Sequence, residues 1–286
     1  RIDNHADFLG FIICVSFDLS EIIIMSTIDQ KILDSLFRDI VKFYSSSQTS
    51  LITLRAIIKA VKFLECEDDM FCVQIREVCK IITNSQPRMF PIDNLIILLE
   101  HELKKNSYFE DKNISVKKSG TIEIIEDLIT RLNYDMRELA NQGLDHITDG
   151  DFIVLHAVEE PVELLLPEAK KMGREFEVLI LRQESVKTNR VIKIMEENQI
   201  KFTVIPEWDL IHTFDKVTKL FIGAYAITAD GRFVSDSGTS NIVSECYIHK
   251  LPIYLFAPIL EITPTVSDDQ NLYLKEESQY ASGVDY

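Results

Sequence analysis

Several residue types and patterns are scarce in this chain. No two of its five cysteines form a Cys-x-x-Cys pair, and their odd number favours a reducing compartment over a disulfide framework. Cys72 and Cys79 lie a heptad apart, but no histidine cluster accompanies them, so we interpret them as core thiols and expect no metal site. The chain has no internal repeat and no low-complexity segment. With 46% hydrophobic and 27% charged residues, it has the composition of an ordinary globular protein.

Positive charge is also scarce. The 30 lysines and arginines are outnumbered by 46 aspartates and glutamates, which gives a formal net charge of −16. Binding to nucleic acid needs a basic surface, so nucleic acid is disfavoured as the main partner. Two interpretations of the acidity stay open, namely attraction of a basic protein partner and solubility alone.

A long uninterrupted apolar run at the start of the chain is missing as well. The apolar stretch at residues 8–24 contains Asp18 and Glu21, whereas a membrane span needs about 20 apolar residues with few charges. This stretch also lacks the basic start and the small-residue cleavage site of a signal peptide. We interpret residues 1–24 as translated leader or a gene-model artefact, and expect the protein to start at Met25.

Residues 25–142 are predicted to form a helical domain, because apolar residues recur there at intervals of three and four. The polar run Ser45–Thr49 interrupts the first helix and offers an N-cap to the second. The polar stretch Lys105–Gly120 is predicted to be a loop. The expected helices contain Ile32–Val41, Leu51–Val61, Phe71–Ile82, Pro91–Leu99 and Thr121–Leu139.

Residues 143–286 are predicted to form a second domain in which strands alternate with helices. Short apolar runs suit buried strands of a parallel sheet, with helices as the crossover connections. The expected fold class is α/β, with the helical N-terminal domain followed by a Rossmann-like, doubly wound and mainly parallel sheet. A short helix is expected at Leu210–Phe214. The expected strands are Phe152–Leu155, Phe176–Leu181, Phe202–Ile205, Lys219–Ile222 and Ile253–Ala257.

The stretch from Phe221 to Thr239 has the layout of an anion site. A buried strand ends at Gly223, Asp230-Gly231 favours a tight turn, and Gly238-Thr239 introduces a helix. Hydroxyls, glycine and backbone N–H groups at the start of a helix suit an anion. Ligands of open α/β sheets bind beyond the carboxyl ends of the strands, so we expect a crevice there.

The same stretch, FIGAYAITADGRFVSDSGT, resembles the pattern G-A-D-x-I-x-x-N-G-x-x-x-N-K-I-G-T of the proteins related to translation initiation factor 2B. That family includes methylthioribose-1-phosphate isomerase and ribose-1,5-bisphosphate isomerase. The resemblance spans residues 25–286 and implies a helical domain before a Rossmann-like one. The positions that match the scaffold of the family's site are Gly223, Gly231, Gly238 and Thr239.

Within the family, the chain most resembles the beta subunit of initiation factor 2B. This likeness rests on the serine–threonine junction Tyr44–Arg55, on the glutamine-proline turn Ile81–Pro87 and on Ala257-Pro258. Delta and alpha subunits usually have a glutamate at the Pro258 position, but a delta or alpha subunit stays open as an alternative. Val284–Tyr286 resembles the start of the family's terminal element, so we expect a closing helix to be missing.

The positions to which the resemblance assigns catalysis carry other residues here. Ala157 stands for the catalytic cysteine and Tyr225 for the catalytic aspartate, so the family's proton shuttle has no counterpart. Gln86 and Asp236 stand for the arginine and lysine that grip phosphate, and a carboxylate repels phosphate. The resemblance therefore implies no enzyme. The alternative is a sugar-phosphate isomerase of the methylthioribose-1-phosphate or ribose-1,5-bisphosphate type.

The resemblance implies a non-catalytic, regulatory beta-type subunit of the cytosolic guanine-nucleotide exchange factor for initiation factor 2, without a cofactor. Its implied partners are delta-type and alpha-type subunits, the catalytic exchange subunits and the alpha subunit of initiation factor 2, with no direct contact to nucleic acid or a membrane. We expect Glu159 and Glu160 in a solvated or interface loop and Lys187–Arg190 in another loop. The residues expected at partner surfaces are Tyr44, Ser46, Thr49, Arg55, Gln86, Arg88, Glu159, Glu160, Lys187, Arg190 and Trp208.

Overall fold

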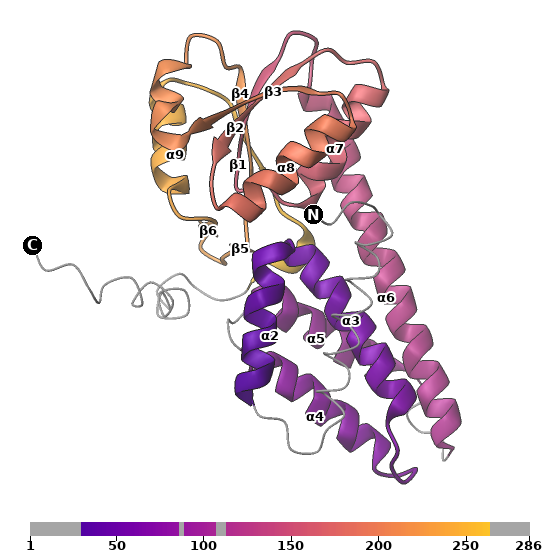
Figure 1. Ribbon diagram of the computed structural model, residues 1–286. Helices are drawn as coiled ribbons and strands as arrows, with labels where there is room; N and C mark the ends of the chain where they lie inside the picture. Colours follow the sequence, from indigo (N-terminus) through magenta and orange to yellow (C-terminus); the bar gives the residue numbers. More distant parts are fainter. Residues whose placement is uncertain (1–29, 86–88, 107–112, 264–286) are drawn as a thin grey trace, which may run out of the picture.

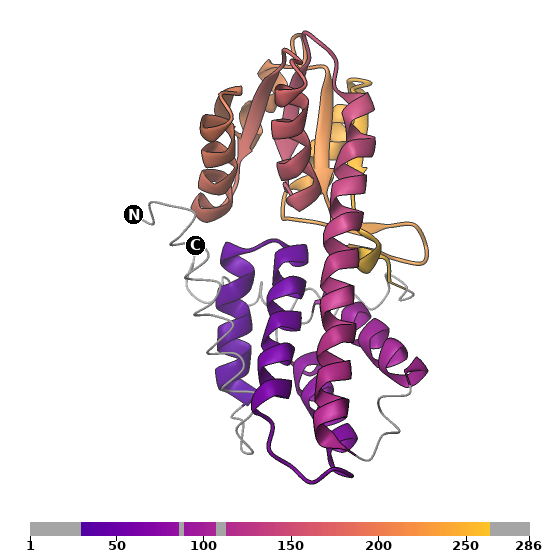
Figure 2. The ribbon, with the colours of Figure 1, turned by 90° about the vertical axis from the view of Figure 1, so that its right-hand side faces the viewer.

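The computed structural model describes residues 30–85, 89–106 and 113–263. Figure 1 shows a helical domain in the lower half of the molecule and a sheet domain in the upper half. One long helix, α6 (Ile114–Gly143), runs beside both domains, as the turned view in Figure 2 makes clear. The fold class predicted from the sequence, helices followed by a parallel α/β sheet, is confirmed.

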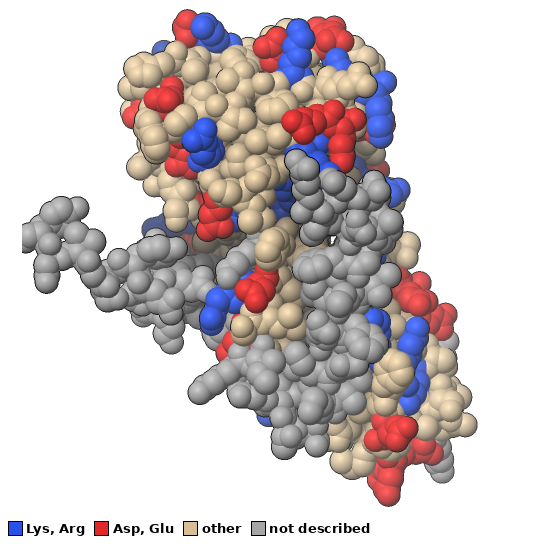
Figure 3. All heavy atoms as spheres, viewed as in Figure 1, with Lys and Arg blue, Asp and Glu red and all other residues tan. Residues whose placement is uncertain are grey.

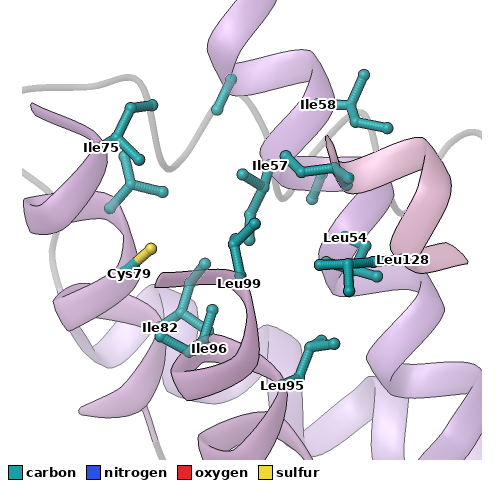
Figure 4. Packing of buried hydrophobic residues seen from close by; sticks show 14 of the residues in the cluster. Leu54, Ile57, Ile58, Ile75, Cys79, Ile82, Leu95, Ile96, Leu99 and Leu128 are labelled. Carbon is teal, nitrogen blue, oxygen red and sulfur yellow. The ribbon is translucent and has the colours of Figure 1, made fainter. Parts of the chain in front are cut away.

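The helical domain is held together by the apolar faces of its amphipathic helices. Within the described residues, four helices precede α6 and bury residues spaced three or four apart. Leu54 and Ile57 of the second of these helices, Leu99 of the fourth and Leu128 of α6 meet in one core (Figure 4). The second helix of the domain starts with a capping box, in which the Ser45 hydroxyl accepts from the Gln48 backbone N–H. The four helices are α2 (Gln30–Phe43), α3 (Ser46–Phe63), α4 (Phe71–Thr83) and α5 (Phe90–Lys105).

Helix α6 starts earlier than the sequence predicts. The Asn113 side chain accepts a hydrogen bond from the Ser115 backbone N–H and caps the helix. The prediction of a loop up to Gly120 is therefore wrong for residues 114–120. The reason is that this turn buries the stem of Lys117, whose ammonium donates to the Asp68 carbonyl oxygen at 2.6 Å. The polar residues at 114–120 thus belong to an amphipathic helix, whose buried side includes the aliphatic part of a lysine side chain.

The described part of the sheet domain, residues 143–263, contains five parallel strands in the order β3-β2-β1-β4-β7. The central pairing sets Val154 of β1 beside Leu179 on one side and Leu220 on the other. The chain leaves β1 first towards one edge of the sheet and then towards the other, so the order reverses between β1 and β4, which is where ligands of such sheets bind. The strands are β1 (Phe152–His156), β2 (Glu177–Arg182), β3 (Lys201–Pro206), β4 (Lys219–Gly223) and β7 (Ile253–Phe256).

The two faces of the sheet are covered differently. Helices α7 (Glu160–Lys171) and α8 (Ser185–Glu197), with the end of α6, pack on one face. The other face is covered by α9 (Thr239–Ile248) and the 3-10 helix η3 (Glu207–His212). The sequence predicts this short helix at 210–214, but it starts directly after Pro206, whose fixed backbone angle suits the entry to a helix.

A short hairpin follows β4, and a 3-10 helix after β7 leads back to the helical domain. The strands β5 (Ala226–Ile227) and β6 (Phe233–Val234) form the antiparallel hairpin expected around Asp230-Gly231. The 3-10 helix η4 (Ile259–Glu261) follows β7 and returns to the helical domain. There the Asn94 amide of α5 donates to the carbonyl oxygens of Leu260 and Ile262 at 2.7 and 2.8 Å. Across the described ranges, no helix is both long and apolar enough to cross a membrane.

Candidate functional site

The candidate site lies at the carboxyl ends of β1 and β4, where the strand order reverses. The Gly223 backbone N–H donates to the Ala157 carbonyl oxygen at 2.9 Å and closes the gap between the two strand ends. A Cβ atom on Gly223 would lie 2.7 Å from that oxygen and 2.5 Å from Cγ of Glu159. The close approach of the two segments therefore requires glycine at this position.

Asp236 is the centre of the crevice. One carboxylate oxygen, Oδ1, lies 2.5 Å from the ammonium of Lys187 and also accepts from the Tyr225 hydroxyl. The other, Oδ2, accepts from the Gln183 amide at 2.8 Å. Burial alone would raise the pKa of Asp236, but the Lys187 charge and these hydrogen bonds outweigh it and hold the pKa below its ordinary value. The carboxylate is therefore ionised and fully occupied by the protein itself.

Tyr225 is correspondingly unable to titrate. Burial, together with the negative charge of Asp236, raises the pKa of the phenol far above its ordinary value. Its hydroxyl also lies 2.7 Å from the ammonium of Lys187. Ala157 offers no titratable group, and its backbone has a positive φ of 47° that brings its N–H to the Gln183 side-chain oxygen. The crevice thus holds no proton shuttle at the two positions that the sequence assigns to one.

His156 ends β1 and is a buried structural histidine. The Thr239 hydroxyl donates to the Asp236 carbonyl oxygen at 2.7 Å, so the Thr239 oxygen accepts from Nε2 of His156 at 2.8 Å. This assigns the ring proton to Nε2 and leaves Nδ1 as the bare nitrogen, 3.4 Å from the Glu207 carboxyl. Burial lowers the pKa of His156 to about 4. Its imidazole is therefore neutral around pH 7.

The second cation of the crevice is also paired. Arg190 Nε lies 2.5 Å from the carboxyl of Glu163, and the guanidinium donates to the Val158 carbonyl oxygen. Burial raises the pKa of Glu163, and the negative charge of Glu163 adds to burial in raising the pKa of Glu160 to about 7. Lys187 and Arg190 thus both bind carboxylates of the same chain. Neither is left to bind a phosphate group.

The four residues that match the scaffold of the family's site lie in two places, the crevice and the hairpin. Gly223 and Thr239 line the crevice, and Gly238 precedes α9 with a φ of 88°. Gly231 lies in the exposed hairpin turn, with a φ of 78°. Both positive angles favour glycine, so the predicted anion-site layout is present in the backbone. The Thr239 backbone N–H donates to the Asp236 main-chain carbonyl oxygen, while the Asp236 carboxylate binds Lys187, Tyr225 and Gln183.

The residues predicted to contact partners differ in their exposure to solvent. Arg55 and Trp208 are exposed, Lys187 and Arg190 are half-buried, and Gln86 and Arg88 lie outside the described residues. The sequence predicts Lys187–Arg190 in a loop, but both residues belong to the first half of α8. The spacing of three between two long cations, just after Ser185, is the signal that could have identified this helix.

Other candidates are buried between the two domains. Tyr44, Ser46 and Thr49 surround the first turn of α3, which faces the sheet domain. Glu159 is buried rather than solvated, because it is the N-cap residue of α7 and binds Ser46, and the half-buried Glu160 opens that helix. Of the two alternatives predicted for Glu159, a solvated position is therefore wrong, and the residue lies at the contact between the two domains. Sequence reasoning also missed Gln183 and Glu261, for which no local pattern exists.

Exposed apolar side chains occur on η3 and α9, the two helices that cover the same face of the sheet. Trp208 and Tyr247 are each 79% exposed, and Ile211 and Ile248 are more than half exposed. We call these four residues of η3 and α9 the α9 patch. In Figure 3, residues other than lysine, arginine, aspartate and glutamate cover most of the visible sheet-domain surface, with charged residues scattered between them. Exposed aromatic and aliphatic side chains of this kind are typical of surfaces that bind proteins.

The fold and the crevice define an α/β protein with a Rossmann-like domain and an internally occupied anion site. The chain belongs to the Initiation factor 2 subunit family, whose model matches residues 43–281. The resemblance to this family predicted from the sequence is therefore confirmed. Within the described residues, no group of three or more His, Cys, Asp or Glu side chains is arranged to hold a metal.

The chain is similar in sequence to part of two longer curated proteins. It is 22% identical to translation initiation factor eIF2B subunit delta of Dictyostelium discoideum over 234 residues, which are 80% of this chain and 37% of the relative. It is 25% identical to eIF2B subunit beta of the same organism over 178 residues, which are 58% of this chain and 46% of the relative. The chain thus spans less than half the length of either curated relative.

Two solved structures share the fold. The tetrameric eIF2B-beta2-delta2 complex from C. thermophilum contains a chain similar to this one, with a TM-score of 0.65 and 24% identity, and the match covers 78% of this chain and 74% of that one. The 5-methylthioribose 1-phosphate isomerase from Pyrococcus horikoshii OT3 has a TM-score of 0.66 and 13% identity, with 79% and 67% covered. One fold thus carries both translation-factor subunits and an isomerase, so function has to be argued from the crevice.

Proposed function

We propose that the chain is a non-catalytic, regulatory subunit of the guanine-nucleotide exchange factor for translation initiation factor 2. The observation that carries this proposal is the ion pair between Lys187 and Asp236, which fills the crevice with groups of the chain itself. A site for a phosphorylated sugar needs free cations and a titratable acid and base. Here the cations are neutralised internally and the phenol of Tyr225 is locked in hydrogen bonds, so the fold serves binding rather than turnover.

The subunit type is proposed to be beta. The support is Ala257-Pro258, which joins β7 to η4 and lacks the glutamate usual in delta and alpha subunits. The delta and beta subunits of eIF2B both match the chain, delta over more residues and beta with slightly higher identity. The two assignments predict different partners: a beta chain pairs with a delta-type subunit, and a delta chain pairs with a beta-type subunit.

Pairing with a homologous subunit is proposed to occur through the sheet domain. The α9 patch gives this domain an apolar surface of the kind that subunits bury in assemblies. The C. thermophilum complex, a beta2-delta2 tetramer, supports an assembly of homologous subunits. Alpha-type and catalytic exchange subunits complete the proposed cytosolic assembly.

The alpha subunit of initiation factor 2 is proposed to bind the helical domain. Arg55 is the exposed residue of the Tyr44–Arg55 junction and is therefore the contact we retain within the described residues. Tyr44, Ser46 and Thr49 are buried, so they pack beneath this surface and are not available to contact a partner. No contact with nucleic acid or a membrane is part of the proposal.

Affinity purification of the tagged chain from its source cell tests the assignment. We expect a delta-type subunit to accompany it, together with the other subunits and initiation factor 2. Recovery of a beta-type partner instead would reassign the chain to delta, and recovery of no homologous subunit would contradict the proposal.

A second experiment tests the absence of catalysis. We expect no turnover of methylthioribose-1-phosphate or ribose-1,5-bisphosphate by the purified chain. Turnover that disappears in Tyr225→Phe would overturn the proposal and establish an isomerase. The variant Tyr134→Phe, on the exposed surface of α6, is the matched control.

A further inference from the structure

Three buried polar groups join the helical domain to the sheet domain. Ser46, the first residue of α3, lies between the carboxyl groups of Glu159, at the start of α7, and Glu261, in η4. Ser46 is 3% exposed, Glu159 5% and Glu261 0%. These three residues are 113 and 215 positions apart in the sequence, so the contact depends entirely on how the two domains are placed.

The number of protons available for these hydrogen bonds determines whether the two carboxyl groups can both be ionised. The Ser46 hydroxyl oxygen lies 3.1 Å from Oε2 of Glu159 and 2.5 Å from Oε1 of Glu261. A hydroxyl donates one hydrogen bond, and an ionised carboxylate donates none. Both contacts are hydrogen bonds only when one of the two carboxyl groups carries a proton and donates it to the Ser46 oxygen.

The proton belongs to Glu261 on geometric grounds. Glu159 already accepts from the Ser46 backbone N–H at 3.2 Å, at the positive end of α3, which favours an ionised carboxylate there. Oε2 of Glu261, by contrast, has no hydrogen-bond partner among the described residues. A neutral carbonyl oxygen tolerates such a position better than a carboxylate oxygen does.

We propose that Glu261 is a neutral carboxylic acid which donates to Ser46, while Ser46 donates to ionised Glu159, and that this proton-dependent clasp fastens α3 to the sheet domain. Opening the clasp frees one end of α3 from α7 and η4. Helix α6 then remains as the continuous element that joins the two domains, with the Asn94 contact to η4 beside it. This inference rests on the contact itself and not on the proposed function.

The electrostatic surroundings agree with the assignment. Burial and the negative charge of Glu159 raise the pKa of Glu261 to about 9, against a small opposing effect of the Ser46 hydrogen bond. The other charged groups acting on the pair are Glu163 of α7, Arg190 of α8 and Asp236 in the loop before α9. Burial also raises the pKa of Glu159, to about 7, but Arg190 and the Ser46 backbone N–H oppose this, so Glu159 ionises before Glu261.

The proton makes the clasp weaken at alkaline pH. The folded protein holds a proton on Glu261 that the unfolded chain releases above its ordinary pKa of about 4.3. The stabilisation is therefore complete at low pH and falls as the pH rises towards the folded pKa of about 9. Replacement of Glu261 by glutamine keeps a donor for Ser46 and removes this dependence.

Urea unfolding of the full chain between pH 5 and 9 tests the clasp. We expect Glu261→Gln to match the wild type at pH 5 and to have an increasingly higher unfolding midpoint as the pH rises. The exposed-site control Glu196→Gln is expected to follow the wild type throughout. Parallel curves for Glu261→Gln and wild type, or a lower midpoint of the variant at every pH, would overturn the proposal.

Infrared spectroscopy of the folded wild type gives a second test that does not need the variant to fold. We expect the carbonyl stretch of a protonated carboxylic acid to persist at pH 8, above the pKa of about 7 of Glu160, and to be lost as the pH is raised through about 9. Ser46→Ala is expected to shift this band, because the acid loses its hydrogen-bond acceptor. Absence of a protonated carboxyl band at pH 8 would refute a neutral Glu261.

Discussion

The ammonium of Lys187 lies 2.5 Å from Oδ1 of Asp236 and places an internal ion pair at the point where the strand order of the sheet reverses. The two residues belong to different elements, α8 and the loop before α9, and are 49 positions apart. Both side chains are mostly buried. The pair therefore holds α8 to the loop before α9 and occupies the place of a ligand.

Asp236→Asn is expected to destabilise the protein. The variant leaves Lys187 without its counter-ion in a mostly buried position, and we expect a loss of about 2 kcal/mol in the free energy of unfolding. Urea denaturation at pH 7 measures this loss. The double variant Asp236→Asn/Lys187→Met is expected to recover part of the stability, and an unchanged midpoint in Asp236→Asn would contradict the role of the pair.

The same variant is expected to bind inorganic phosphate. Without the negative charge of Asp236, the mostly buried Lys187 ammonium has lost its counter-ion and attracts another anion. Phosphate at ten times its dissociation constant should then raise the free energy of unfolding by about 1.4 kcal/mol. The wild type and the double variant, which lacks Lys187, are expected to show no such gain. Equal effects of phosphate on all three proteins would disprove the freed site.

Two glycine variants are expected to differ in severity. Gly223→Ala places a Cβ atom 2.7 Å from a backbone oxygen of Ala157, so we expect a loss of more than about 2 kcal/mol in the free energy of unfolding. Gly231→Ala meets no atom within 4 Å and only suffers from its φ of 78°, so we expect about 1 kcal/mol. Thermal or urea unfolding compares the two. The reverse order of severity would refute the close approach at Gly223.

His156 is expected to make the protein sensitive to acid. The folded protein keeps this imidazole neutral down to a pKa of about 4, whereas the unfolded chain takes up a proton near 6.5. Stability is therefore present above pH 6.5 and falls as the pH drops to 4, by about 3 kcal/mol from this residue. His156→Gln should flatten this limb of the stability curve, while His212→Gln, at an exposed position, should not. Equal slopes for His156→Gln and wild type would argue against a buried neutral histidine.

The isolated chain is expected to self-associate through the α9 patch. Tyr247→Asp/Ile248→Asp should shift the protein towards the monomer in size-exclusion chromatography and weaken its recovery with a homologous subunit, because charges are costly in a buried apolar contact. Met172→Asp changes another apolar residue that is more than half exposed, at the end of α7, and serves as the control. A wild-type chain that is a stable monomer and ignores the homologous subunit would contradict this interface.

The sequence allows the sheet to be predicted but not the contents of its crevice. Buried strands such as Phe152–His156 are continuous apolar runs, and the reversal between β1 and β4 follows from alternation with helices. The start of α6 was missed because its first turns are polar on the outside. Burial of Ser46 and Glu159, and the pairing of Lys187 with Asp236, arise from tertiary contacts between distant segments, which no local pattern encodes.

Helix α6 has 30 residues and is therefore about 45 Å long. A straight element of that length, fixed in both domains, acts as a lever, since a small rotation at the sheet end becomes a displacement of several ångströms at the far end of the helical domain. The Ser46 clasp gives this lever a second point of attachment. The spacing between the α9 patch and the helical domain is therefore held by a continuous helix together with the buried contact of Ser46 with Glu159 and Glu261.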